Sequence, residues 1–272
     1  MASDTFAGWR PARVIDNRPL ANGSMWIELE AMDELAAAYE PGHVLSLGIP
    51  LDGALLRHAY TVSCGDHSNR RFAHLYRVIA GGRMTPRMSQ LSPGARMFFH
   101  GPFHTPIQQE IQAEAERIIL IATGTGVGPL FGYAQKTLSE GEPRGVSLYA
   151  SFREESDICL SGDLDMLARR HPNFDWRYSV SHPSNGWRGL TGRVTDWVPG
   201  EIARHSLDRF HFHLVGHGEM VHLVRQALYR AGVAQERVSI ETYFHHHAEP
   251  AEAEVDSLAE RFGKSGENRF QA

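Results

Sequence analysis

The sequence predicts a two-domain protein, in which an N-terminal antiparallel β-barrel is followed by a doubly wound parallel α/β domain. Up to about residue 103, short strand-like segments alternate with gaps rich in Gly and Pro, which is typical of a closed or sandwiched antiparallel sheet. From residue 117, strand patterns alternate with helical ones, which indicates a parallel sheet covered on both faces. The 272 residues suffice for two separate cores.

The barrel is expected to occupy residues 1–105. Its strands are predicted at residues 12–16, 25–29, 43–49, 59–63, 72–79 and 96–99. Residues 106–116 are polar and carry no strand pattern, so they are expected to connect the barrel to the second domain.

The second domain is expected at residues 117–244. Its elements are predicted in the order strand 118–122, helix 130–139, strand 145–151, helix 164–170, strands 175–180 and 211–215, helix 220–231 and strand 238–243. The extension, residues 245–272, begins acidic and rich in alanine, and it predicts a helix with a solvated face after Pro250.

A glycine-rich turn follows the most apolar strand. It reads Thr123-Gly124-Thr125-Gly126-Val127-Gly128-Pro129. Three residues without Cβ and the N-terminus of a helix near Pro129 suit the close approach of a phosphate, so a nucleotide diphosphate is the expected ligand. The spacing fits neither of the two common phosphate-loop patterns, and a close-packed turn without a ligand is the alternative.

Two stretches of the barrel carry a second set of candidates. Arg57, Tyr60 and Thr61 begin one strand, where they could bind a phosphate, stack on a flat ring and hydrogen-bond a ring heteroatom. In the run 81–88, Thr85 can cap a helix that Pro86 starts, leaving N–H groups aimed at an anion. The alternatives are a solvated charge beside a core tyrosine, and a cap without a ligand.

Composition narrows the function classes. The net charge is −5, which gives no support for a nucleic-acid partner. No segment is apolar for long enough to span a bilayer and no secretory signal is visible, so a cytoplasmic protein is expected. Two cysteines, Cys64 and Cys159, cannot ligate an ordinary iron–sulfur cluster, so an organic cofactor is expected to carry any electrons.

Four motifs in order resemble one family. They are Arg57-x-x-Tyr60-Thr61, Gly82-x-x-Thr85, Thr123-Gly124-Thr125-Gly126-x-x-Pro129 and Gly216-x-x-x-Met220. Together they resemble the plant-type ferredoxin–NADP reductase superfamily, and most closely the bacterial ferredoxin or flavodoxin NAD(P)H reductases. The resemblance covers about residues 12–244.

The resemblance implies FAD on the barrel. Arg57 would pair with the flavin pyrophosphate, Tyr60 would lie against the isoalloxazine, and Thr61 would sit near flavin N5. The candidate flavin-binding residues are Arg57, His58, Ala59, Tyr60, Thr61, Tyr76, Arg77, Val78, Gly82, Arg83, Met84 and Thr85.

The resemblance also implies NADPH or NADH on the second domain. The candidate residues there are Thr123, Gly124, Thr125, Gly126, Pro129, Arg153, His182, Arg193, Gly216 and Met220, and the strand ending Glu241-Thr242-Tyr243-Phe244 is similar to the family's aromatic ending beside the flavin. Val215 stands where many members have a cysteine. His182 stands where NADPH-using members have an arginine, which weakens NADPH preference and leaves the choice between the two coenzymes open.

The resulting hypothesis is a flavoenzyme that passes hydride from NAD(P)H to FAD and electrons to ferredoxin, flavodoxin or an oxygenase component. The candidate catalytic residues are Tyr60, Thr61, Glu241 and Tyr243, and a candidate docking face comprises Arg70, Arg71, Arg83 and Arg87. A flavin-binding relay subunit without turnover of its own is the alternative. His211 and His213 are interpreted as polar edges of the sheet, His245-His246-His247 as no metal site, and the extension as a segment that could cover the flavin or the adenine.

Overall fold

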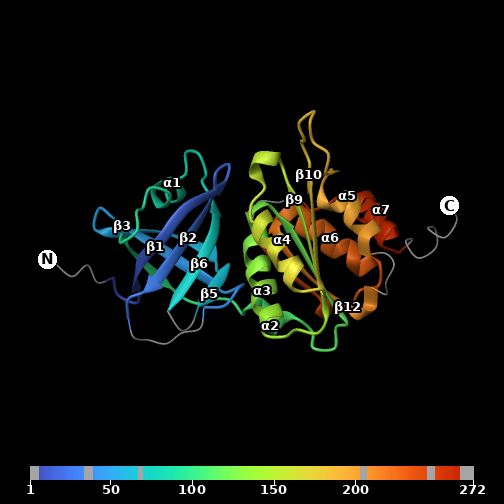
Figure 1. Ribbon diagram of the computed structural model, residues 1–272, viewed down its shortest axis with the longest axis horizontal. Coiled ribbons are helices and arrows are strands. Elements are labelled where there is room, and N and C mark those ends of the chain that lie inside the picture. The colour runs from blue at the N-terminus through green and yellow to red at the C-terminus, as the bar shows by residue number, and fades with distance from the viewer. Residues whose placement is uncertain (1–5, 34–38, 67–69, 203–206, 244–248, 264–272) are drawn as a thin grey trace.

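The computed structural model describes residues 6–33, 39–66, 70–202, 207–243 and 249–263. Two domains lie side by side along the long axis of the molecule (Figure 1). The first is a curled antiparallel sheet and the second is a parallel sheet with helices on both faces. The predicted fold class is therefore confirmed.

The first domain is a seven-stranded antiparallel sheet in the order β4-β3-β7-β1-β2-β6-β5. Its strands are β1 (Arg10–Ala21), β2 (Ser24–Ala31), β3 (Val44–Leu51), β4 (Ala54–Thr61), β5 (Cys64–Asp66), β6 (Arg71–Arg77) and β7 (Arg96–His100). The strand β4 also contacts β6, so the sheet curls toward closure. Alternate residues of β2, such as Ile27 and Leu29, fill the interior.

A short helix, α1 (Thr85–Met88), follows β6. Thr85 does not cap this helix, contrary to the expectation, because the N-cap position belongs to Met84 and Thr85 lies inside the first turn. Its Oγ1 instead accepts a hydrogen bond of 2.9 Å from the backbone N–H of Ile79. The hydroxyl thus closes the loop that contains Gly81 and Gly82.

The second domain is a parallel sheet in the order β11-β10-β9-β8-β12-β13. Its strands are β8 (Arg117–Thr123), β9 (Gly145–Phe152), β10 (Phe174–Val180), β11 (Leu190–Thr191), β12 (Phe210–His217) and β13 (Val238–Tyr243). Its helices are α3 (Val127–Ser139), α4 (Ser161–Arg170), α5 (Val194–Ile202) and α6 (Gly218–Arg230). The strand order reverses between β8 and β12, and ligands of such sheets bind at the carboxyl ends of the strands beside this point.

Short 3₁₀ turns complete the second domain. They are η1 (Gly124–Gly126), η2 (Glu155–Asp157), η3 (Leu207–Arg209) and η4 (Gln235–Arg237). A further short helix, α2 (Ile107–Glu110), lies in the connector between the domains.

The helix α3 lies between the barrel and the parallel sheet (Figure 1). Two glycines make this close approach feasible. A Cβ on Gly128 would lie 2.6 Å from Ser63 Oγ, and a Cβ on Gly132 would lie 1.6 Å from the backbone oxygen of Ser63. Apolar residues of the barrel, Trp26 and Leu75, join the core on this face of the sheet, so the two domains share one continuous apolar interface.

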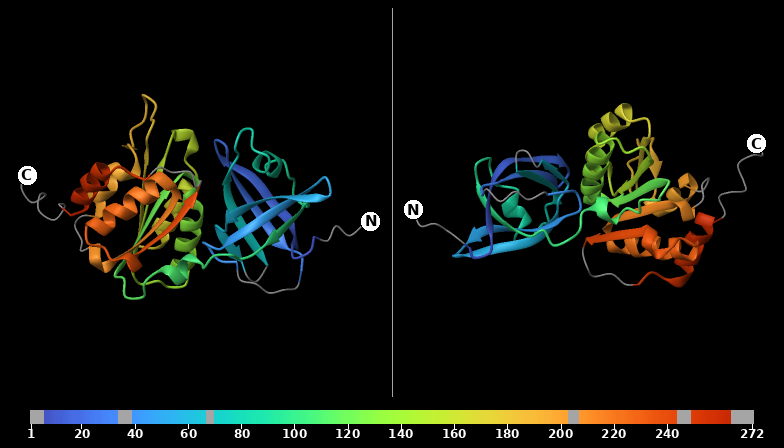
Figure 2. Two further views of the ribbon diagram at one scale, coloured as in Figure 1. Left: turned by 180° about the vertical axis from the view of Figure 1, so that it is seen from behind. Right: turned by 90° about the horizontal axis from the view of Figure 1, so that it is seen from below.

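The extension forms a helix, α7 (Glu252–Gly263), on the opposite face of the sheet. Val255, Leu258 and Phe262 are buried in the core shared with α5 and α6. The helix lies at the far end of the molecule from the barrel (Figure 2). The expectation that the extension covers the flavin is therefore wrong for this helix, because its apolar stripe has a nearer partner in α5 and α6. No helix in the described ranges has the length and apolar character that a membrane crossing needs.

His211 and His213 are not at an edge of the sheet, contrary to the interpretation from the sequence. They belong to β12, which lies between β8 and β13, and they are 0% and 2% exposed. Burial lowers the pKa of His211 to about 4 and that of His213 to about 3. Both rings are therefore neutral near pH 7.

Candidate active site at the domain interface

The two domains meet through Thr61 and Glu241, which are 180 positions apart in the chain. Thr61, at the end of β4, donates a short hydrogen bond from Oγ1 to Oε1 of Glu241 on β13. Burial, with a smaller contribution from the neighbouring Glu110, raises the pKa of Glu241 to about 7, although the hydrogen bond from Thr61 opposes both effects. The pair thus places a titratable carboxyl beside the hydroxyl predicted to face the flavin ring.

Tyr60 precedes Thr61 on β4 and packs against the barrel core. Its hydroxyl is buried and has no hydrogen-bond partner among the described residues. A buried hydroxyl without a partner costs roughly 1–3 kcal/mol, so a ligand that supplies a partner is favoured here. Its ring lies 6.3 Å from that of Tyr76, which belongs to the barrel core and donates to Asn17 Oδ1 at 3.1 Å.

The outer surface of β4 offers a place for the rest of the cofactor. Arg57, His58 and Ala59 are exposed there. The predicted second phosphate contact lies after β6, where Arg83 is exposed and Met84 is buried among core residues. Met84 can therefore contact a ligand through its backbone but not through its side chain.

Arg77 has a partner in the other domain. Its Nη1 lies 3.1 Å from Oδ1 of Asp157 in η2, and the backbone N–H of Asn22 donates to the oxygen of Ser156 at 2.7 Å. The side chain of Arg77 thus links the barrel to the second domain. Flavin contacts by Tyr76, Arg77 and Val78 stay predictions.

The glycines of the turn after β8 differ in role. A Cβ on Gly124, whose φ is +53°, would meet nothing within 4 Å, so open space lies above it. A Cβ on Gly126 would lie 2.4 Å from the oxygen of Val215, so this glycine allows β12 to approach. The expected accessible backbone is therefore found at Gly124, whereas Gly126 and Gly128 face protein.

Thr123 and Gly216 join β8 to β12 at the reversal of strand order. Thr123 Oγ1 accepts from the backbone N–H of His217 at 2.8 Å. Gly216 has φ +141°, and a Cβ there would lie 2.2 Å from Thr123 Oγ1. Met220, four residues later, is 8% exposed and belongs to the core.

The three candidate contacts for the coenzyme phosphate lie at the carboxyl ends of the strands. Arg153 follows β9 and His182 follows β10, and the N–H of His182 donates to the backbone oxygen of Arg153 at 2.8 Å. Arg193 precedes α5 and its Nη1 lies 3.5 Å from Oε1 of Glu219. All three are exposed. A phosphate bound at Arg193 competes with Glu219 for the same guanidinium.

The strand β13 ends beside Thr61. Tyr243 packs against the interface core, and burial raises its pKa well above the ordinary value. Phe244 and His245-His246-His247 lie outside the described residues.

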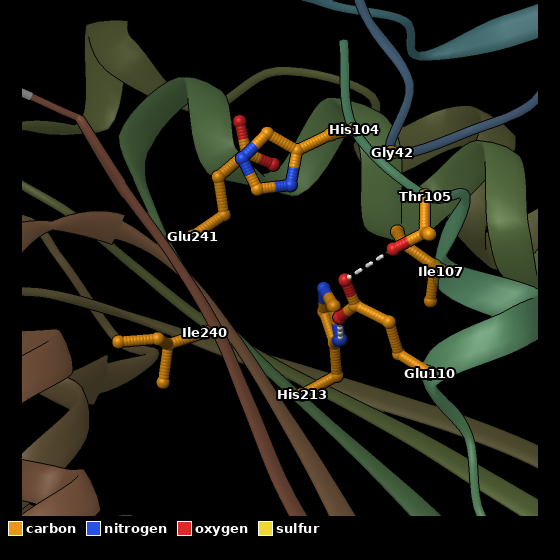
Figure 3. Close-up of a pocket in the computed structure, with 8 residues that line it drawn as sticks. All are labelled: Gly42, His104, Thr105, Ile107, Glu110, His213, Ile240 and Glu241. Atoms are coloured by element: carbon orange, nitrogen blue, oxygen red, sulfur yellow. Dashed lines mark hydrogen bonds and ion pairs between the residues drawn. The ribbon is translucent and has the colours of Figure 1, made fainter.

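The sequence analysis missed a cavity beneath Glu241. It is lined by Gly42, His104, Thr105, Ile107, Glu110, His213, Ile240 and Glu241 (Figure 3), and it is called the Glu241 cavity below. Glu110 comes from the connector, which carries no pattern in the sequence, and His213 comes from β12. A polar residue in the middle of an apolar strand, such as His213, is the one signal that could have indicated it.

The four arginines proposed as a docking face do not lie together. Arg70 and Arg71 lie at the start of β6, while Arg83 and Arg87 follow its end, and a seven-residue strand spans roughly 20 Å. Arg71 pairs with Glu28 at 3.3 Å. The single face that we expected is therefore divided between two ends of the barrel.

The described residues fit a flavin between the domains. Tyr60 has a buried hydroxyl without a partner among the described residues, Arg57 is exposed on the same strand, and the backbone at Gly124 is open after β8. The barrel thus offers a ring and a cation, and the second domain an open backbone, which are groups that bind a ligand with a flat ring and phosphates.

Comparisons with known proteins match both domains. Residues 22–106 match the oxidoreductase FAD-binding domain, and residues 120–226 match the oxidoreductase NAD-binding domain. Ferredoxin–NADP reductase B of Sorangium cellulosum is 30% identical over 237 residues, which are 85% of this chain and 96% of that protein.

Solved structures share the fold. The cytochrome P450 reductase of Amycolatopsis superposes with a TM-score of 0.74 at 25% identity, over 86% of this chain and 70% of that one. A ferredoxin NADP⁺ reductase from Neisseria gonorrhoeae with bound FAD and NADP superposes with a TM-score of 0.76 at 15% identity, over 88% of this chain and 100% of that one. With both domain models matched and a relative aligned along nearly its whole length, the chain belongs to the ferredoxin–NADP reductase family of FAD- and NAD(P)-binding oxidoreductases.

Proposed function

We propose that this protein accepts hydride from NADH or NADPH on a bound FAD and passes electrons to ferredoxin, flavodoxin or an oxygenase component. The observation that carries the proposal is the hydrogen bond from Thr61 of the barrel to Glu241 near the carboxyl end of β13 in the coenzyme sheet. The flavin, when bound, supplies hydride acceptance and one-electron release.

The chain's own residues position the reaction. Tyr60 offers a ring face and a hydroxyl with no partner in the described part of the chain. Thr61 donates a hydrogen bond to Glu241 and is also hydrogen-bonded to Tyr243. A hydroxyl oxygen has two lone pairs, so one remains to accept from a ring N–H. Glu241, with a pKa raised to about 7, can take the hydroxyl proton of Thr61 as that oxygen receives another from a ring N–H, and can return it near neutral pH.

The electron acceptor is supported by the relatives. The aligned Sorangium protein is a ferredoxin–NADP reductase, and the Amycolatopsis structure is a reductase of cytochrome P450. Both names describe delivery of electrons to another protein. A cytoplasmic location is part of the same proposal, since Cys64 and Cys159 are free thiols.

Anaerobic mixing of the FAD-loaded protein with NADH or NADPH tests the proposal. The flavin absorbance should bleach within the time of one turnover, and ferricyanide should restore it. Flavin-loaded protein that neither coenzyme bleaches would support the relay subunit instead. Addition of ferredoxin from the same cell, with reduction followed by its visible spectrum, then tests the acceptor.

A further inference from the structure

The Glu241 cavity is lined by polar groups from three parts of the chain. Glu110 comes from α2, His213 from β12 and Glu241 from β13, and they point into one space (Figure 3). The cavity has about 20 Å³ of space for the centre of a water molecule, and one water needs roughly 10–15 Å³ by this measure. It therefore has room for about one ordered water molecule.

His213 needs a partner that the described residues do not supply. Its ring is 2% exposed and neither ring nitrogen makes a hydrogen bond in the described part of the chain. Its Nδ1 lies 3.5 Å from Oε2 of Glu110, which also lines the cavity. A neutral imidazole carries one donor and one acceptor, and buried polar groups of this kind are usually satisfied by ordered water.

Two carboxyls face the same space. Burial raises the pKa of Glu110, and Glu110 in turn raises the pKa of Glu241. His104 and the hydroxyl of Thr105 face Glu110 from the connector and lower its pKa, while His213 faces it from β12 as a neutral ring. Two neighbouring carboxyls with raised pKa values can exchange a proton with each other.

The cavity opens toward solvent at the connector. His104 and Thr105 are exposed at this end, and Thr105 Oγ1 donates to Oε1 of Glu110 at 3.1 Å. At the other end, Glu241 accepts the proton of Thr61. Polar groups therefore extend from the proposed flavin edge, through the cavity, to the surface.

We propose that the Glu241 cavity is a water-filled proton passage, in which Glu110 carries protons between Glu241 and solvent and His213 positions the water between the two carboxyls. This inference rests on the proposed function. Two electrons that leave the flavin for two one-electron acceptors leave one proton behind. Thr61 gives its hydroxyl proton to Glu241 as its oxygen receives the proton left behind. Glu241 then passes a proton through water to Glu110, Glu110 releases one past Thr105, and each residue regains its starting state.

The test measures proton release apart from coenzyme turnover. FAD-loaded protein is reduced with dithionite, freed of excess reductant, and mixed with excess ferricyanide in weak buffer containing a pH-indicator dye. In the wild type, proton release keeps pace with the return of flavin absorbance. A positioned proton carrier contributes a factor of roughly 10²–10⁴, and partial bypass by water leads us to expect release about tenfold slower in Glu110→Gln.

Two further variants complete the test. His213→Leu, which fills the space without ring nitrogens, should slow release severalfold. Glu116→Gln is the matched control, because this carboxylate lies later on the same connector and pairs with Arg209 outside the cavity. Its release should equal that of the wild type.

A second readout follows the carboxyl itself. The infrared band of protonated Glu241, identified by its loss in Glu241→Gln, should titrate with a lower pKa in Glu110→Gln, because a neighbouring negative charge is gone. Wild-type release rates in both cavity variants, or an unmoved titration of Glu241, would overturn the passage. Failure of both coenzymes to bleach the flavin would refute the proposed function alone, since dithionite replaces them here.

Discussion

At the residue scale, the ionisation of Glu241 should affect the stability of the fold as well as the proposed reaction. Its pKa is raised from the ordinary 4.5 to about 7. Between these pH values the folded protein keeps a proton that the unfolded chain has lost, so stability falls as pH rises through this range. The expected loss is on the order of 2–3 kcal/mol and stays constant above about pH 7.

Glu241→Gln should remove that loss, since the amide has no charge to bury. In flavin-free protein, the variant and the wild type should unfold in urea with equal free energies at pH 3.5, below both pKa values. At pH 8.5 the variant should be the more stable by on the order of 2–3 kcal/mol. Glu236→Gln, an exposed change on η4, should show no such difference. Parallel pH profiles for Glu241→Gln and the wild type would contradict the raised pKa.

His182 is expected to influence the preference of the protein for NADPH or NADH. It is exposed beside Arg153, where an arginine could bind a 2′-phosphate through two hydrogen bonds. Hydrogen bonds to charged groups contribute roughly 1.5–3 kcal/mol, so His182→Arg should raise the ratio of kcat/KM for NADPH over NADH about tenfold. His171→Arg, before the opposite end of β10, should leave the ratio unchanged. An unchanged ratio in His182→Arg would show that the 2′-phosphate of NADPH does not bind beside residue 182.

At the element scale, α3 joins the coenzyme domain to the barrel. Its N-terminus follows the turn at Gly124, and its side packs against β5 and β6. The helix was predicted at residues 130–139, but its docking face was not, because a glycine in a helix gives no indication of which backbone lies against it. Gly132 is explained only by the oxygen of Ser63.

Gly132→Ala should separate α3 from the barrel, because the new Cβ would lie 1.6 Å from a backbone oxygen. Overpacking of this kind costs about 1–3 kcal/mol, and hydride transfer to the flavin should slow with it. Gly162→Ala on α4 is the matched control, since its Cβ would meet nothing within 4 Å. That variant should be equally stable or more stable by up to about 1 kcal/mol. Urea unfolding of both proteins measures the difference, and equal stability would contradict the docking geometry.

At the scale of the whole molecule, the relative position of the domains decides whether coenzyme and flavin meet. Besides α3, the barrel is held by Arg77 and Asp157, with side chains 43% and 7% exposed. The sequence analysis named Arg77 as a flavin contact. The structure shows that its guanidinium pairs with Asp157 in η2, and the flavin contact stays a prediction.

Arg77→Met should therefore slow flavin reduction by coenzyme severalfold and leave the dissociation constant of FAD within about twofold, a change of less than 1 kcal/mol. Arg18→Met serves as the control, because Arg18 pairs with Asp16 on the same strand. Stopped-flow reduction and flavin fluorescence measure the two quantities. A large loss of FAD affinity with normal reduction of the saturated protein would restore the original interpretation of Arg77.

The sequence by itself determined the two domains, the alternation of strands and helices in the second, and the motifs at Tyr60, Thr61 and Gly124. These follow from local patterns of apolar residues and from turn chemistry, which act over a few positions. The roles of Gly126, Gly132, Arg77, Glu110 and His213 were decided only by the tertiary structure. Each depends on an atom far away in the chain, and only packing and burial decide whether a glycine admits a neighbour or a histidine loses its charge.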